Sequence, residues 1–134
     1  MYKRGAAIYG DIRFQSGRRL LMRYVVAQNR TAYNYQFSER GNSSPQQGVP
    51  HGADLSELMS PSTNAAGATL AKQFISFATK QSPNSDGLPD WPTYGTDKHM
   101  LSLRSGSVSL ITDTYRDAAM KVLLTPDART ATGK

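Results

Sequence analysis

The residues best suited to proton transfer lie in Gly48-Val49-Pro50-His51-Gly52, which continues into Ala53-Asp54-Leu55. An imidazole titrates near neutral pH, so His51 can accept and return a proton, and flanking glycines let the backbone and a ligand come close. Asp54 could orient the imidazole ring, or it could cap the turn that follows. The competing interpretation is an exposed histidine in a Gly/Pro loop, and we take His51 as the candidate catalytic residue.

Other site chemistries find little support in the sequence. The absence of cysteine excludes thiol catalysis, a disulfide framework and a thiolate zinc site. The two histidines, His51 and His99, cannot form a His-rich metal site, and the P-loop, Rossmann and HExxH patterns are missing. Ser107 is the serine nearest to a nucleophile elbow, but it lacks the second glycine of G-x-S-x-G. We therefore expect no metal, no cofactor and no nucleophile in this chain.

The positive charge is concentrated at the start of the chain. Residues 1–40 hold eight Lys/Arg and two Asp/Glu, whereas residues 41–134 hold eight of each, giving a net charge of +6. Such a patch could bind phosphates, with tyrosines as stacking faces, in a basic binding module without catalysis. We favour a solvated helix face opposite an apolar stripe, and we expect no nucleic-acid partner. The basic residues are Lys3, Arg4, Arg13, Arg18, Arg19, Arg23, Arg30 and Arg40.

The first half of the chain predicts a helix, a strand and the histidine loop. Asp11 is a candidate N-cap, Ser16-Gly17 a candidate break, and residues 18–28 the main helix. Residues 31–37 alternate and are rich in aromatics, which indicates a strand, and residues 38–50 form a polar loop. The apolar stripe expected on the helix consists of Leu20, Leu21, Tyr24 and Val25.

The second half predicts helices around a small hairpin. A helix over 68–80 should bury Leu70, Ala71, Phe74, Phe77 and Ala78, with Lys72 and Gln73 pointing away. A Pro/Gly-rich surface loop over 81–97 carries Trp91, and a hairpin turns at Ser105-Gly106. Asp113 or Thr114 should cap a last helix, over 113–124, with an apolar stripe that includes Tyr115 and Val122, and we expect residues 125–134 to be a disordered tail.

Length and hydropathy limit the architecture. A chain of 134 residues with 38% hydrophobic content fits one domain with one core. No apolar run approaches the ~18 residues that a membrane span needs. The opening residues lack a signal-peptide core, so we expect neither a membrane span nor a signal peptide, and the compartment stays open.

Six short motifs occur in an order that resembles the C-terminal part of type-B carboxylesterases, the serine esterase and lipase family that includes the cholinesterases. Each motif is loose alone, but together they cover nearly the whole chain. They are Tyr9-Gly10-Asp11 with Phe14 and Arg18-Arg19, Ala32-Tyr33-Asn34-Tyr35, G-V-x-H-G with Asp54 and Leu55, Phe74 to Thr79 with Pro83-Asn84, Leu88-Pro89-Asp90-Trp91-Pro92 with Tyr94, and Asp113 with Arg116.

The resemblance implies a fold and a reaction. The fold is α/β, the C-terminal part of an α/β-hydrolase with an incomplete sheet, and residues 1–134 form one portion of that domain. The reaction is hydrolysis of a carboxylic ester by a Ser, Glu, His triad, in which His51 is similar to the triad histidine. Departures are Ser16-Gly17, where relatives often carry Pro, and Asp54, where Glu is usual.

By this resemblance the chain is about the last quarter of an enzyme. It contains no counterpart of the nucleophile elbow, the oxyanion loop or the triad glutamate, so we expect it to be inactive alone. An ester substrate is expected only in a complete enzyme, and relatives of the family are often secreted. The strand around Tyr35 would lack its usual parallel neighbour, so its exposed edge could mediate self-association, and a partner-dependent, non-catalytic remnant stays an open alternative.

Overall fold

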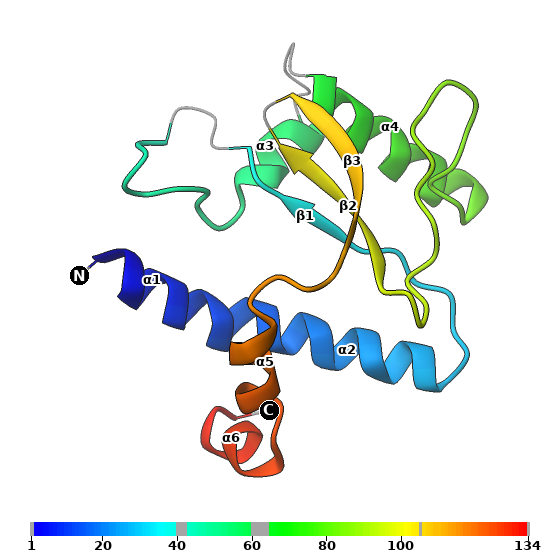
Figure 1. Cartoon of the computed structure of the whole chain (residues 1–134). Helices are drawn as coiled ribbons and strands as arrows, with labels where there is room; N and C mark the ends of the chain where they lie inside the picture. Colours follow the sequence, from blue (N-terminus) through cyan, green and yellow to red (C-terminus); the bar gives the residue numbers. More distant parts are fainter. Residues whose placement is uncertain (1, 40–42, 60–64, 105, 134) are drawn as a thin grey trace. The chain divides into compact units, whose positions relative to one another are not determined.

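The computed structural model describes residues 2–39, 43–59, 65–104 and 106–133, which form two compact units (Figure 1). The first unit joins residues 1–32 to residues 113–134, and the second comprises residues 33–112. Helices and strands are both present, as the sequence predicts.

The N-terminal helix of the first unit starts earlier than predicted and does not break. It consists of α1 (Tyr2–Gly10), a single π-helical turn η1 (Asp11–Gln15) and α2 (Ser16–Ala27). Asp11 does not cap it, because this buried side chain accepts a hydrogen bond from Arg116 Nε instead. The hydroxyl of Ser16 donates to the carbonyl of Ile12 at 3.0 Å and is satisfied inside the helix.

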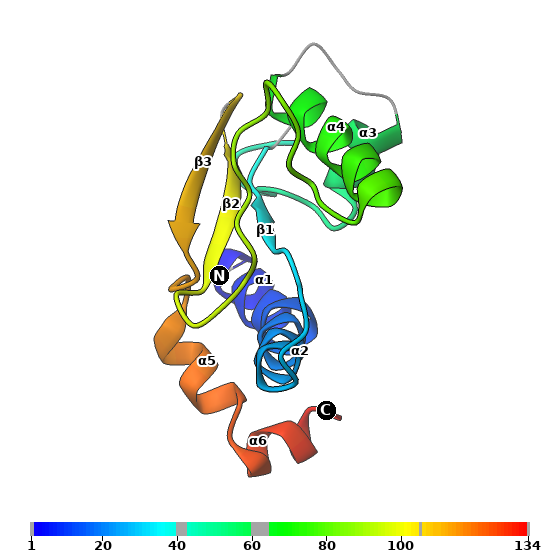
Figure 2. The ribbon, with the colours of Figure 1, turned by 90° about the vertical axis from the view of Figure 1, so that its right-hand side faces the viewer.

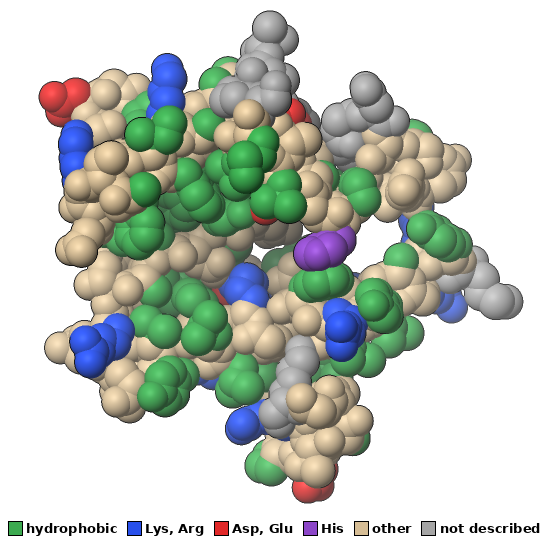
Figure 3. Space-filling model, turned by 180° about the vertical axis from the view of Figure 1, so that it is seen from behind, with side chains coloured by type: hydrophobic (Ala, Val, Ile, Leu, Met, Phe, Trp, Pro, Cys, Tyr) green, Lys and Arg blue, Asp and Glu red, His purple; other side chains and the backbone are tan. Residues whose placement is uncertain are grey.

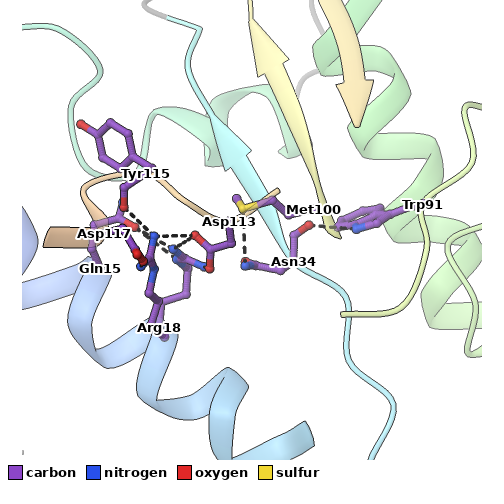
Figure 4. Close-up of polar contacts among 9 residues, drawn as sticks. Gln15, Arg18, Asn34, Trp91, Met100, Asp113, Tyr115 and Asp117 are labelled. Carbon is purple, nitrogen blue, oxygen red and sulfur yellow. Dashed lines mark hydrogen bonds and ion pairs between the residues drawn. The ribbon is translucent and has the colours of Figure 1, made fainter. Parts of the chain in front are cut away.

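Two arginines of α2 are engaged in ion pairs, so the prediction of a solvated basic face is wrong for them. Arg18 binds Asp113 through two bonds, of 2.7 and 2.9 Å. Buried Arg19 contacts Asp113 at 3.1 Å and Asp117 at 2.7 Å. Figure 4 shows Arg18 pointing to Asp113. The side chain of Asp113 is fully buried, so a buried carboxylate draws these guanidinium groups inward.

The apolar stripe predicted on α2 is wrong for Leu21 and Tyr24, whereas Leu20 and Val25 are half-buried. Leu21 is 56% exposed and Tyr24 is 64% exposed, whereas the buried residues of the helix are Ser16, Arg19 and Met22. The buried side of α2 therefore combines an ion-paired arginine, a serine and one hydrophobic residue, Met22. Figure 3 shows hydrophobic side chains at the surface of the face that it draws.

The C-terminal segment contains two short helices, α5 (Asp117–Leu123) and α6 (Pro126–Ala131). The helix predicted over 113–124 starts later, because buried Asp113 pairs with arginines and does not act as a cap. The N-cap position of α5 is Arg116, which adopts a left-handed conformation, and the carbonyl of Thr114 accepts from the amide of Asp117 at 3.1 Å. Of α5 only Met120 is buried, so the predicted stripe is mostly exposed.

The expected disordered tail is wrong over its larger part, because residues 126–131 form α6. The hydroxyl of Thr125 accepts from the amide of Ala128 at 3.4 Å, and Pro126 occupies the start of the helix. A threonine N-cap followed by proline is a typical helix start. Lys134 lies outside the described residues.

The second unit contains a three-stranded sheet in the order β1 (Tyr35–Phe37), β2 (His99–Arg104), β3 (Ser107–Thr112). The antiparallel pairing of β2 with β3 confirms the predicted hairpin. The strand predicted over 31–37 is shorter, and it has a parallel neighbour within this chain: β1 pairs with β2, with Tyr35 opposite Leu101. The strand therefore has a parallel neighbour from downstream in the chain, whereas among the described residues no strand pairs with its other edge, where the resemblance implies an upstream strand.

Two helices, α3 (Ala53–Met59) and α4 (Ala65–Lys80), lie on one side of this sheet (Figure 2). The hydrophobic core between these helices and the sheet is small, and it includes Trp91 from the loop over 81–97. Its fully or nearly buried members are Ala66, Leu70, Trp91, Leu101 and Leu103, with Tyr33, Tyr35, Phe37, Leu58 and Val108 packed against them.

The buried face of α4 is rotated from the predicted one. Gln73, expected to point away, is 0% exposed, whereas Phe77 is 49% exposed and Phe74 and Ala78 are also exposed. The amide nitrogen of Gln73 donates to Pro89 O at 2.9 Å. The hydroxyl of Ser76 donates to Ser82 O at 2.9 Å. These polar side chains face inward because they satisfy backbone carbonyls of the loop over 81–97.

Candidate functional site

His51 lies in a tight turn between β1 and α3, and its side chain is exposed to solvent. Gly48 and Gly52 adopt φ values of +72° and +79°, a region that favours glycine over residues with a side chain. These glycines allow the chain to reverse on both sides of His51. The turn therefore presents the imidazole at the surface of the unit that contains the sheet, as the loop pattern predicts.

Backbone hydrogen bonds close the turn immediately after His51. The amide of Ala53 donates to the carbonyl of Pro50 at 3.2 Å, and the amide of Leu55 donates to the carbonyl of Gly52 at 3.0 Å. The first bond spans His51, and the second forms the next turn, which leads directly into α3. Any group that fixes the start of α3 therefore also affects the position of the imidazole.

Asp54 is the side chain that makes such a contact. It lies in the first turn of α3, and its Oδ2 accepts a hydrogen bond from the hydroxyl of Tyr35 on β1 at 2.6 Å. Burial raises the pKa of Tyr35 well above its usual range, and the hydrogen bond and negative charge of Asp54 raise it further. The Tyr35 hydroxyl thus stays protonated and donates its hydrogen bond, and the Asp54 carboxylate accepts it, which links β1 to α3.

The ring of Tyr35 is fixed by an aromatic cluster. It packs edge-on against Phe74 of α4, with ring centroids 5.9 Å apart, and against Trp91, at 5.8 Å. Tyr33, two residues earlier, packs edge-on against Trp91 as well, at 6.0 Å. Such edge-to-face pairs favour one ring orientation, so the Tyr35 hydroxyl is aimed from a rigid base.

Trp91 is in turn bound to the strand that carries Tyr35. Its indole nitrogen donates to the carbonyl of Asn34 at 2.9 Å, and the Asn34 amide nitrogen lies 3.8 Å from the sulfur of Met100 on β2. Figure 4 shows Asn34 between Trp91 and Met100. The same carbonyl accepts from the amide of Leu101 at 3.1 Å, so one oxygen joins the loop to the sheet.

Sequence reasoning identified His51 and Asp54 but not Tyr35. The alternation over 31–37 places Tyr33, Tyr35 and Phe37 on one face, and the structure packs all three against the core. The signal for Tyr35 was therefore present: a hydroxyl-bearing side chain on the core face of the strand before the histidine turn. Neither its pairing with Asp54 nor the buried position of Trp91 follows from local pattern.

The described residues hold neither a metal-binding cluster nor a membrane-spanning helix. Within residues 2–39, 43–59, 65–104 and 106–133, no three His, Cys, Asp or Glu side chains gather in a way that could hold a metal ion. No helix in the same described part of the chain has the length and apolarity required to cross a membrane. The site consists of an exposed imidazole, a neighbouring carboxylate and a phenol donor.

Comparison with known proteins yields fungal lipases. No protein-family model matches the chain. Lipase 1 of Geotrichum candidum is 33% identical over 117 residues, which are 86% of this chain and 20% of that protein. Lipase 2 of the same organism has the same identity and coverage. Secreted lipase 1 of Botryotinia fuckeliana is 26% identical over 123 residues, 88% of this chain and 21% of that protein.

Among solved structures, an esterase from Clostridium hathewayi that can hydrolyse aliphatic aromatic polyesters superposes with a TM-score of 0.62 at 16% identity. The match covers 75% of this chain and 22% of that esterase. It confirms the predicted fold, part of an α/β-hydrolase. The chain spans about a fifth of the length of the curated relatives it matches, in their C-terminal part, which confirms the predicted resemblance.

Proposed function

We propose that this chain, which is similar to the C-terminal part of the carboxylesterase and lipase family, contributes the general base of a serine carboxylic ester hydrolase, and that His51 is that base. One observation carries the proposal: in a chain that matches lipases over 86% of its length, the histidine of a Gly-bounded turn between strand and helix is exposed to solvent. A catalytic imidazole must reach its substrate, and this one is accessible.

The role of His51 would be to take the proton of a serine nucleophile and return it to the leaving alkoxide. In the family a carboxylate orients the other ring nitrogen, and backbone amides stabilise the oxyanion. None of the corresponding sequence motifs is in this chain. The substrate of the complete enzyme would be a carboxylic ester, with selectivity set mainly by residues outside residues 1–134.

The basic binding module receives less support. Arg18 and Arg19, two of the cations that a phosphate would contact, bind Asp113 and Asp117. A phosphate would have to displace carboxylates already in place, one of them fully buried. A partner-dependent remnant shares the structural features of the first proposal and differs from it only in lacking catalysis.

A chimeric lipase tests the proposal. The matching C-terminal segment of Geotrichum candidum Lipase 1 is replaced by this chain, and tributyrin hydrolysis is measured for the chimera, its His51→Ala variant and a His99→Gln control. We expect the first substitution to reduce kcat at least roughly a thousandfold and the control to have little effect, because a triad works as a unit. An active chimera that is indifferent to His51→Ala would refute the role of His51.

A further inference from the structure

We propose that Tyr35 and Asp54 are positioning residues for His51: their hydrogen bond ties the histidine turn and the start of α3 to the sheet. This inference rests on the proposed function, because it explains how an exposed imidazole on a loop can be kept in place. The bond joins residues 19 positions apart in sequence and has an oxygen–oxygen distance of 2.6 Å. A short bond from a hydroxyl to a carboxylate is among the stronger kinds.

One end of this bond is rigid. The ring of Tyr35 packs between Phe74 and Trp91. Its strand pairs with β2 in parallel register, with Tyr35 opposite Leu101, which is nearly fully buried. The Tyr35 hydroxyl therefore has a defined position relative to the sheet, and this position determines where Asp54 can bind it.

The other end needs support. Helix α3 has seven residues, none of them fully buried, and its last residue, Met59, is 84% exposed. A helix of fewer than two full turns forms too few internal hydrogen bonds to persist without tertiary contacts. Leu58 packs against the core near the end of α3, and at its start Asp54 is hydrogen-bonded to Tyr35 of the sheet.

The position of Asp54 in the chain makes this contact effective. Asp54 lies between Ala53, whose amide closes the turn that contains His51, and Leu55, whose amide closes the next turn. Fixing Asp54 therefore restrains both bonds, at Pro50 O and at Gly52 O. Released from Tyr35, the start of α3 would fray, and the glycine-flanked turn would gain the freedom that Gly52 allows.

The test uses the full 134-residue chain and four variants, which are Tyr35→Phe, Asp54→Asn, the combination of these two, and Asp54→Glu. Tyr35→Phe keeps the ring and removes only the donor. The matched control is Tyr33→Phe, on the same face of the strand and in the same aromatic cluster. The readouts are amide hydrogen exchange at Ala53 and Leu55, ¹⁵N order parameters at residues 51–55, and the midpoint of global unfolding in urea.

We expect amide exchange at Ala53 and Leu55 to accelerate roughly tenfold in each single variant and no further in the double variant, because both lose the same bond. The order parameter at His51 should fall, while exchange at β2 amides stays unchanged. Asp54→Glu should restore part of the protection. Unchanged local exchange, or equal loss throughout the unit, would overturn the inference. Neither result depends on catalysis, so the inference can fail while the role of His51 stands.

Discussion

Asn84 binds the backbone of Trp91 at two points. Its Oδ1 accepts from the Trp91 amide at 2.8 Å, and its Nδ2 donates to the Trp91 carbonyl at 3.1 Å. The Trp91 side chain is buried in the core, and its indole donates to Asn34. One asparagine thus folds a loop rich in proline and glycine onto the core, which gives a physical reason for the Pro83-Asn84 and Trp91-Pro92 motifs in the sequence.

Asn84→Ala is expected to destabilise the unit formed by residues 33–112 by about 2 kcal/mol, because the Trp91 amide and carbonyl both lose their partner. Urea unfolding followed by tryptophan fluorescence measures this, since Trp91 is the only tryptophan. Gln46→Ala, at an exposed loop position, is the control and should change stability little. If the two variants unfold at the same midpoint, the two hydrogen bonds between Asn84 and Trp91 do not contribute to stability.

Asp113→Asn is expected to destabilise the first unit by about 3 to 5 kcal/mol, since it removes the fully buried carboxylate that Arg18 and Arg19 share and leaves Arg19 with Asp117 alone as its paired carboxylate. Arg18 loses its bidentate partner at the same time. Loss of helical circular dichroism with urea is the measurement. Asp127→Asn, on the exposed side of α6, provides the comparison. An equal, small effect of both variants would show that the buried ion pairs contribute nothing to stability.

The raised pKa of Tyr35 gives a pH dependence with a definite sign. Its folded-state pKa exceeds the ordinary tyrosine value near 10, so the protonated phenol favours the folded state. Its contribution to stability is therefore complete below about pH 10 and is lost as the pH rises further. Asp54→Asn should lower the pKa of Tyr35, because the hydrogen bond and charge of Asp54 both raise it.

Absorbance at 295 nm, compared between the wild type and Tyr35→Phe, measures this ionisation. The two chains should gain the same phenolate absorbance between about pH 9 and 11, because Tyr35 stays protonated there. If the wild type gained more phenolate absorbance than Tyr35→Phe, by the amount expected for one tyrosine, Tyr35 would titrate in the ordinary range. The burial and the Asp54 contact described here would then not hold in solution.

The free edge of β1 is expected to mediate self-association. The carbonyl of Asn34 and the amide of Ser38 form hydrogen bonds to β2. Because backbone groups alternate along a strand, those of Tyr35 and Phe37 point to the opposite edge. No strand of the described residues pairs with that edge. Size-exclusion chromatography with light scattering should show a mass that rises with concentration. Gln36→Lys should reduce it, whereas Ser109→Lys on β3 should not. A monomer at every concentration would contradict this expectation.

The sequence predicted the elements of the second unit better than the faces of the helices. The hairpin, the histidine turn and α4 follow from turn residues and periodicity, which are local properties. Which side of a helix is buried depends on its partners. Arg19 and Gln73 are buried because Asp113 and the Pro89 carbonyl receive them, whereas Leu21 is exposed. No local pattern contains those distant partners.

The residues of the candidate site also differ in whether local sequence predicts them. His51 and Asp54 could be selected from their residue types and spacing within a short segment. The hydrogen bond from Tyr35 to Asp54 could not be predicted in this way, because it depends on how α3 is placed against β1 in three dimensions. Asn84 was visible only as part of a loose motif, and its function in orienting Trp91 emerges from the path of the loop.

The most direct test of the account is the rate at which a fluorophosphonate labels the family's nucleophilic serine in the chimeric lipase. Labelling requires an activated serine, so it reports the general base without substrate turnover. We predict that His51→Ala slows labelling at least roughly a thousandfold, while His99→Gln leaves it nearly unchanged. Labelling at the same rate with and without His51 would contradict the assignment of this residue as the catalytic base.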